Sequence, residues 1–236
     1  MAFRFKAACG AGEAEEFTGL NQGLTLTSLL ARDLCVDRGG RTIVKNISFD
    51  LRAGEALVAL GRNGAGKSTL LRAIAGFLPL SGGRLSHTGA EAEIPLPELS
   101  HYVGHADGLK SALTAAENLA FWARMLARSD ETPSPSSALQ RVGLKRLADF
   151  PVAYLSAGQK RRVALARLFM APRPLWILDE PATALDIASQ QVLAEAFAEH
   201  RAAGGMILAA THAPLGLVDA ATLDLGSAPA DLGGNA

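Results

Sequence analysis

The chain has 236 residues, of which 49% are hydrophobic, and it carries 23 basic and 23 acidic side chains. This length and composition suit a packed globular core, and a formal net charge of zero excludes an overall field that would collect nucleic acid or an anionic membrane surface. The two cysteines, Cys9 and Cys35, exclude a disulfide framework and a four-thiolate zinc site, and they favour a reducing compartment.

The first part of the chain divides into a leader and a region of predicted strands. Residues 1–27 are rich in Ala, Gly and Thr without helical or strand periodicity, which predicts a disordered leader. Apolar and polar residues then alternate over 29–36 and 43–51 on either side of the turn 38–41, and this pattern predicts an antiparallel hairpin. The apolar run 55–60 is bounded by glycines, so we expect a buried strand there.

Beyond residue 60, predicted helices and strands alternate. The predicted helices cover residues 67–77, 118–126, 157–170 and 186–203, and the predicted strands cover residues 175–178 and 206–210. A Thr114–Glu117 capping box precedes the second of these helices, and the polar segment Ser129–Ser137 has the composition of a linker. Because strand and helix alternate, we expect an α/β fold with a mostly parallel sheet and a helical insert over about 105–157.

The segment GRNGAGKS, residues 61–68, matches the phosphate-loop pattern G-x-x-x-x-G-K-[ST]. Its glycines let consecutive backbone N–H groups surround an anion, and the helix that follows adds a partial positive charge. In such a loop Lys67 reaches the β- and γ-phosphates and the Ser68 hydroxyl holds Mg²⁺. The alternative is a glycine-rich turn with a solvated lysine, but a position between a predicted strand and helix favours nucleotide binding. The predicted nucleotide contacts in this segment are Gly61, Arg62, Asn63, Gly64, Ala65, Gly66, Lys67, Ser68 and Thr69.

Two carboxylates, Asp179 and Glu180, follow the predicted strand 175–178. Ligands of such folds bind at the carboxyl edge of the sheet, where Asp179 can hold Mg²⁺ and Glu180 can polarise a water for attack on the γ-phosphate. Paired acids at a strand end also suit a solvated turn. The phosphate loop in the same chain favours the catalytic interpretation.

A second glycine-containing turn, LSAGQ at residues 155–159, precedes a helix-forming run to Met170. Ser156 is a natural N-cap and Gly158 leaves the first turn bare, so this helix start is a second predicted anion site. One nucleotide cannot bury both anion sites within one subunit if they lie on opposite flanks of the fold.

With these motifs in this order, residues 28–225 resemble the ATP-binding cassette (ABC) family. The resemblance implies a P-loop NTPase fold with a mostly parallel core sheet, an N-terminal antiparallel β subdomain, an inserted helical subdomain and a short tail at 226–236. It also implies an ATPase that acts as a head-to-tail pair with a second copy of itself. ATP and Mg²⁺ would lie between the Lys67 loop of one copy and the turn Ser156, Ala157, Gly158 and Gln159 of the other.

The same resemblance implies roles for four further side chains. Asp186 matches a dimer-contact aspartate, and His212 matches a histidine that senses the γ-phosphate, although a histidine at a strand end is more often structural. Arg38 occupies the position of an aromatic residue that usually stacks on adenine, and a guanidinium plane can also stack there. His105 replaces a glutamine that usually touches the metal and faces the membrane subunit, so it is a candidate metal contact and coupling residue.

Four local segments are similar to the ATP-binding subunit of the haem exporter of the bacterial cytochrome c maturation system. They are His105 and residues 117–122, 175–178 and 200–212. This similarity implies a polytopic membrane subunit as partner, a position on the cytoplasmic face of the bacterial inner membrane, and no nucleic-acid partner. For residues 117–122, packing of Leu119, Phe121 and Trp122 inside the insert is an equally good explanation.

Two alternative functions follow from the same motifs. An exporter of another substrate, such as a drug, lipid or ion, stays open because no residue of such a subunit contacts the cargo. A soluble ATPase linked to nucleic acid predicts tandem cassettes, a long coiled-coil insert or a basic face. The chain has one cassette, a short insert and zero net charge, so this class is disfavoured.

Overall fold

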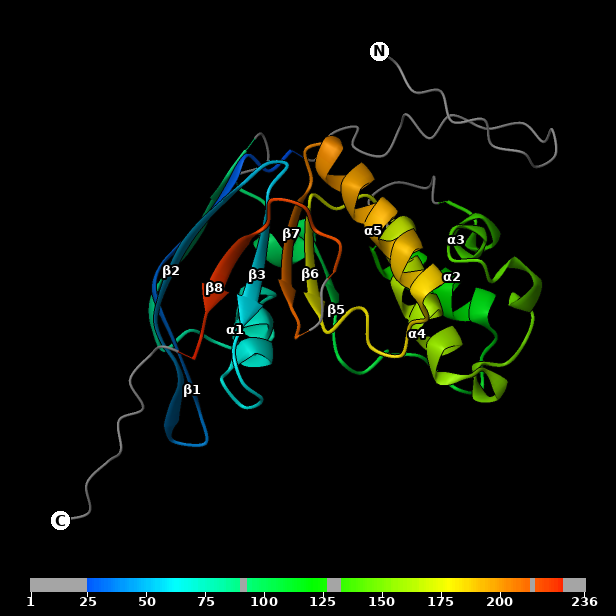
Figure 1. Ribbon diagram of the computed structural model, residues 1–236, viewed down its shortest axis with the longest axis horizontal. Helices are drawn as coiled ribbons and strands as arrows, with labels where there is room; N and C mark the ends of the chain where they lie inside the picture. The colour runs from blue at the N-terminus through cyan, green and yellow to red at the C-terminus, as the bar shows by residue number, and fades with distance from the viewer. Residues whose placement is uncertain (1–24, 90–92, 127–132, 213–214, 227–236) are drawn as a thin grey trace.

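The computed structural model describes residues 25–89, 93–126, 133–212 and 215–226. Two sheets lie side by side, and most of the helices cover the face of the second sheet that points away from the first (Figure 1). The first sheet is antiparallel with the order β2–β1–β4, from β1 (Ser28–Arg38), β2 (Arg41–Arg52) and β4 (Gly82–Thr88). The second is parallel with the order β5–β6–β7–β3–β8, from β3 (Ala56–Leu60), β5 (Ser100–Val103), β6 (Leu175–Asp179), β7 (Met206–Ala210) and β8 (Ala221–Asp224).

The helices connect and cover these strands. The α-helices are α1 (Lys67–Ile74), α2 (Ala115–Leu126), α3 (Pro135–Arg141), α4 (Ala157–Ala166) and α5 (Ile187–Ala202). Short 3₁₀ turns are η1 (Leu96–Leu99), η2 (Lys145–Leu147), η3 (Val152–Tyr154) and η4 (Arg167–Phe169). The segment from α2 to η3 forms the helical insert, and it returns the chain to the parallel sheet through α4.

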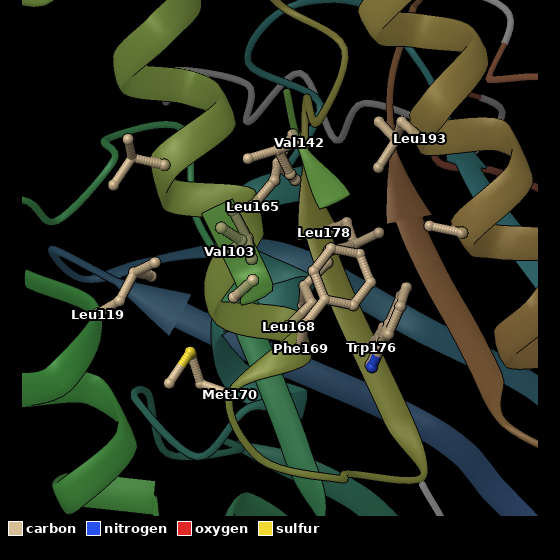
Figure 2. Close-up of a cluster of buried hydrophobic side chains, with 14 of the residues drawn as sticks. Val103, Leu119, Val142, Leu165, Leu168, Phe169, Met170, Trp176, Leu178 and Leu193 are labelled. Atoms are coloured by element: carbon tan, nitrogen blue, oxygen red, sulfur yellow. The ribbon is translucent and has the colours of Figure 1, made fainter. Parts of the chain in front are cut away.

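The parallel sheet separates two hydrophobic cores, because its central strands are buried on both faces. Along β6, Leu175 and Ile177 face the core between the two sheets, which also contains α1. Trp176 and Leu178 alternate with them and face the second core, under α2, α4 and α5 (Figure 2). The period-two alternation of β6 therefore lets one strand contribute side chains to both cores.

The expected fold class is confirmed. The hairpin of β1 and β2, the parallel sheet, and the strands β3, β6 and β7 form as the patterns predicted. The capping box before α2 is also present, since Thr114 N donates to Glu117 Oε2 at 2.8 Å and Glu117 N donates to Thr114 Oγ1 at 3.1 Å. These elements form where periodicity and capping residues in the local sequence predict them.

Some element boundaries differ from the prediction. Helix α1 ends at Ile74 instead of residue 77, and α4 ends at Ala166, where η4 takes over the run expected to continue to 170. The predicted linker Ser129–Ser137 is wrong at its end, because Ser134 caps α3 by accepting a hydrogen bond from Ser137 N at 3.2 Å. Residues 129–132 of that linker lie outside the described residues.

Strands β4, β5 and β8 were not predicted from the sequence. Strand β4 begins with two glycines and is half-exposed, while β8 is almost wholly exposed, so neither has a clear alternation. Strand β5 contains Ser100 and His101, which are buried although they are polar. His101 is satisfied there by a hydrogen bond between its Nε2 and the carbonyl of Ala171 at 2.8 Å.

The two chain ends reach beyond the described region. Of the predicted leader, residues 1–24 lie outside the described residues, whereas Leu26 is 3% exposed and belongs to the core between the sheets. Of the predicted tail, residues 227–236 lie outside. Among the described helices, none is long and apolar enough to cross a membrane.

Candidate active site

The carboxyl ends of β3, β5, β6 and β7 meet at one edge of the parallel sheet, and the segments that follow them line a cavity of about 390 Å³. The phosphate loop supplies one wall of this cavity, the end of β6 supplies two carboxylates, and the segments after β5 and β7 supply one histidine each. The lining residues are Ile43, Asn63, Gly64, Gly66, Lys67, Ser68, Thr69, His105, Asp179, Glu180 and His212. Arg62 is exposed outside this lining, and Ala65 packs against the core between the sheets.

The phosphate loop has a conformation that requires glycine where the helix begins. Gly66 is the N-cap of α1 with φ of 97°, in the left-handed region, and no side chain caps the helix. A Cβ at this position would lie 2.9 Å from the carbonyl oxygen of Ile43, so the loop packs directly on β2. The first amides of α1 are therefore left open toward the cavity, which is the arrangement that binds phosphate.

Lys67 holds its ammonium group inside the loop. The residue is 7% exposed, and its Nζ donates hydrogen bonds to the carbonyl oxygens of Gly61 at 2.6 Å and Arg62 at 3.2 Å. Among the described residues that line the cavity, Lys67 alone is a lysine or arginine. The loop thus presents one positive charge together with uncapped amides.

Asp179 carries a buried oxygen that lacks a partner. It ends β6, pairs in register with Ala210 of β7, and is 1% exposed. Its Oδ2 accepts no hydrogen bond from the part of the chain that the structure describes. A buried, unpartnered carboxylate oxygen that shares a cavity with the Ser68 hydroxyl is the donor set that Mg²⁺ prefers, so these residues fit the metal.

Glu180 and His212 lie against each other across the ends of β6 and β7. His212 Nε2 is 2.9 Å from Glu180 Oε1, at an angle that is not that of a hydrogen bond, so this oxygen stays without one among the described residues. Glu180 has φ of 51°, a strained conformation for a residue with a side chain, and its N–H donates to the carbonyl oxygen of Ala210 at 2.8 Å. The Glu180 side chain is 15% exposed, against 53% for His212.

The Ser156 turn, residues 156–159, is not among the residues that line this cavity. Ser156 caps α4 by accepting from Gln159 N at 3.2 Å, while its own N–H donates to Gln159 Oε1 at 2.8 Å. Ser156 and Ala157 are exposed. A Cβ on Gly158 would lie 2.7 Å from the carbonyl oxygen of Ala184, so glycine permits the close approach of the turn to the loop after β6.

Two other predicted site residues also lie outside the cavity lining. Arg38 is exposed at the end of β1, where it pairs with Arg41 across the hairpin turn. Asp186 caps α5 by accepting from Ser189 N at 2.8 Å, and hydrogen bonds from the Ser189 side chain and from its N–H lower the pKa of the Asp186 carboxyl below its usual range. Asp186 therefore lies beyond the same loop that the Ser156 turn contacts.

Sequence reasoning missed two residues at the site. Ile43 of β2 lines the cavity, and nothing in the hairpin pattern distinguishes it from its neighbours. Arg161 of α4 is 3% exposed and donates to the carbonyl oxygens of Asp179 and Glu180 at 2.9 and 2.8 Å. An arginine in the second turn of a helix that follows a motif is a weak signal, because most such arginines are solvated.

A family model described as ABC transporter matches residues 44–183. This chain belongs to the ABC transporter family. It is an ABC-type ATPase, and the matched segment contains the phosphate loop, the Ser156 turn and both carboxylates at the end of β6.

Curated relatives and a solved structure agree with the ABC assignment. The cytochrome c biogenesis ATP-binding export protein CcmA of Rhodopseudomonas palustris is 47% identical over 189 residues, which cover 80% of this chain and 94% of that protein. The protein of the same name from Paramagnetospirillum magneticum is 50% identical over 200 residues, covering 83% and 92%. The solved structure of an ATP-binding subunit of an ABC transporter has a TM-score of 0.69 and 28% identity, covering 79% of this chain and 80% of that one.

Proposed function

We propose that this ABC protein hydrolyses ATP to drive an exporter that serves the assembly of c-type cytochromes, with haem as the cargo delivered. The observation that carries the proposal is identity of 47–50% over at least nine tenths of two proteins named for ATP-binding export in cytochrome c biogenesis. The cavity at the sheet edge supplies the residues that such an activity requires. Haem itself follows from the resemblance of the local segments around His105 and residues 117–122.

In the proposed mechanism the phosphate loop binds the nucleotide and Glu180 acts on the attacking water. The uncapped amides of α1 and the Lys67 ammonium hold the phosphates, and Ser68 and Asp179 hold Mg²⁺, with His105 as a further ligand from the same cavity. When bound, Mg²⁺ neutralises charge on the phosphate oxygens. Glu180 orients the water and accepts its proton, and His212 beside it contacts the γ-phosphate.

The Ser156 turn is proposed to complete the site of a second copy. It is exposed and separate from the cavity of its own chain, and the Ser156 hydroxyl, which accepts one hydrogen bond from Gln159, keeps its own proton to donate. A head-to-tail pair would place this hydroxyl and the small residues Ala157 and Gly158 against the phosphates bound by the partner copy. Asp186 would line the same interface, and Arg38 would stack on adenine.

The membrane partner is proposed to dock in a groove of about 460 Å³ between the parallel sheet and the helical insert. Gly104 and Ala106, on either side of His105, line this groove together with Trp122 and Phe77, whose exposed fraction is 64%. Phe121 packs against Trp122 and is 48% exposed. Because the loop of His105 borders both the cavity and the groove, it connects nucleotide state to the partner, a polytopic subunit in the bacterial inner membrane, at whose cytoplasmic face this protein would bind.

Complementation tests this function. A bacterium that lacks its own cytochrome c biogenesis ATP-binding export protein is given this chain, and covalently bound haem in its c-type cytochromes is measured. Restoration by the wild type and by Arg84→Gln, a change on the exposed edge of β4, together with failure of Glu180→Gln, is the expected result. Normal ATPase activity without restoration of cytochrome c would overturn the cytochrome role and favour another cargo.

A further inference from the structure

Arg161 is a buried arginine whose hydrogen bonds join three separate elements. It lies in the second turn of α4 and is 3% exposed. Its acceptors are the carbonyl oxygens of Pro181 (3.1 Å), Gly104 (2.8 Å), Asp179 (2.9 Å) and Glu180 (2.8 Å), and Oδ1 of Asp107 (3.0 Å). A guanidinium has five N–H donors, and here five acceptors engage it.

These acceptors belong to the two loops that carry the reactive residues. Three are consecutive carbonyls at the end of β6, around Glu180, and the other two flank His105 in the loop after β5. A lysine in place of Arg161 would offer one compact ammonium, which cannot span acceptors on both loops in the plane of a guanidinium. The hydrogen bonds of Arg161 therefore connect the end of β6 and the His105 loop to α4.

The hydrogen bonds of Arg161 restrain the backbone of Glu180, which has an unfavourable conformation. Its φ of 51° is unfavourable for a residue with a side chain and persists only where the surroundings impose it. The N–H of Glu180 is held by Ala210, and its carbonyl oxygen is held by Arg161, so the residue is fixed on both sides. The direction in which the Glu180 carboxylate leaves the chain depends on these two restraints.

We infer that Arg161 is a positioning residue that aims the carboxylate of Glu180, and the loop of His105, in its own chain and relative to α4. The inference rests on the proposed function, in which the Ser156 turn at the start of α4 meets the nucleotide of the second copy. A shift of α4 at that interface is carried by Arg161 to the catalytic edge of the same subunit. Arg161 thereby links hydrolysis at one nucleotide to the state of the other.

The first experiment compares Arg161→Lys with Arg162→Lys, the same change at the next residue of α4. Arg162 donates to the carbonyl oxygen of Val142 at 3.3 Å and is not among the residues lining the cavity. A misplaced catalytic group costs on the order of 10²-fold in rate, so Arg161→Lys should lower kcat by that factor and leave KM for ATP within about twofold. Arg162→Lys should leave both constants, and its melting temperature, close to the wild type.

The second experiment separates action within a chain from action on the partner copy. Mixed dimers with two affinity tags combine a Glu180→Gln chain with a chain whose Glu180 is intact, and Arg161→Lys is placed in one or the other. The inference predicts that the change abolishes most of the remaining ATPase activity only when it shares a chain with the intact Glu180. If the change acts instead from the Glu180→Gln chain, Arg161 serves only the Ser156 turn, and the inference is overturned.

Three further results would test the positioning role of Arg161. Unchanged kcat in folded Arg161→Lys, or equal losses in Arg161→Lys and Arg162→Lys, overturns the inference. Should Arg161→Lys not fold, Asp107→Asn replaces it, since it removes the charge of one acceptor of Arg161 and leaves the other four acceptors unchanged. A kcat lowered by roughly tenfold is then expected and an unchanged kcat overturns the inference. A wild-type dimer without any ATPase activity would instead overturn the proposed function on which the inference rests.

Discussion

The starts of α1 and α4 are both glycine-containing helix N-termini, yet of the two only the start of α1 lines the cavity at the sheet edge. Gly66 leaves α1 without a side-chain cap, and the start of this helix lines one cavity together with Asp179 and Glu180. At the start of α4 the capping box engages the N–H groups of Ser156 and Gln159, and Ser156 and Ala157 are exposed. The two helix starts thus differ in whether side chains already occupy some of the first N–H groups that could bind an anion. The phosphate-loop side carries the lysine and the two carboxylates of the cavity within one chain, whereas the proposed contribution of the Ser156 side is a hydroxyl and small residues.

One carboxylate on the phosphate-loop side should control the rate of ATP hydrolysis. Glu180→Gln should bind ATP as the wild type does and hydrolyse it about 10²–10⁴-fold more slowly, because glutamine cannot accept the proton of the attacking water. Phosphate release and calorimetric titration measure the two quantities. Full turnover in the variant would move this role to another side chain, of which His212, 2.9 Å away, is the nearest described candidate.

Lys67→Ala should weaken ATP binding on the order of 10²-fold or more, because it removes the buried positive charge that we propose to hold the phosphates. Titration calorimetry measures the affinity. Lys145→Ala, an exposed lysine of the helical insert, is the matched control and should bind ATP normally. Equal affinities of the two variants would remove the chemical distinction between the starts of α1 and α4.

Gly158→Ala tests how tightly the Ser156 turn is held by its own chain. The added Cβ would lie 2.7 Å from the carbonyl oxygen of Ala184, and such overpacking costs about 1–3 kcal/mol of the free energy of unfolding. Urea unfolding measures this cost, with the exposed Ala157→Ser as control. An unchanged free energy would mean that the turn moves independently of the loop after β6, contrary to its tight packing.

Two buried histidines near the start of β6 make the free energy of unfolding depend on pH, and neither of them lines the active-site cavity. Burial lowers the pKa of His101 to about 3 and that of His200, stacked on Trp176 at 3.9 Å between ring centroids, to about 4. Unfolded histidines titrate near 6.5, so the unfolded state binds more protons below that pH, and stability falls from about pH 6.5 down to about pH 4 by up to about 1.4 kcal/mol per pH unit for each group.

His200→Phe keeps an aromatic ring against Trp176 and removes one of these two titrations. Its free energy of unfolding should therefore fall less steeply between pH 6.5 and 4 than that of the wild type, whereas ATP affinity at pH 7.5 should be unchanged. Urea unfolding at a series of pH values provides the test. Parallel curves for the two proteins would show that another group causes the loss of stability.

The smallest expected effect concerns the loop that borders both the cavity and the groove. His105→Ala should leave the ATP affinity of the isolated chain nearly intact, because the exposed imidazole is one contact among many. It should lower the partner-dependent part of hydrolysis by a few fold, as expected when one hydrogen bond of about 1 kcal/mol is lost. ATPase rates with and without the membrane subunit measure this stimulation. Equal stimulation of the variant and the wild type would exclude a coupling role for His105.

Several elements could be predicted because their signals are local. The phosphate loop, the strands β3, β6 and β7, and the capping box at Thr114 depend on neighbouring residues and on periodicity, which the sequence states directly. Strands β4, β5 and β8 lack such signals. His101, for example, can be buried in β5 because its Nε2 donates a hydrogen bond to the carbonyl oxygen of Ala171, seventy positions away.

The sequence by itself determined the chemistry of the site, since residue types and short spacings define the phosphate loop, the Asp179–Glu180 pair and the capped turn at Ser156. Tertiary structure alone decided which of these groups share a cavity. It excluded Arg38, Asp186 and the Ser156 turn from the cavity lining and brought Ile43 into it. It also buried Arg161 against both reactive loops, because hydrogen bonds between α4, β5 and β6 depend on how the sheet and the helical insert pack, and no local pattern records that packing.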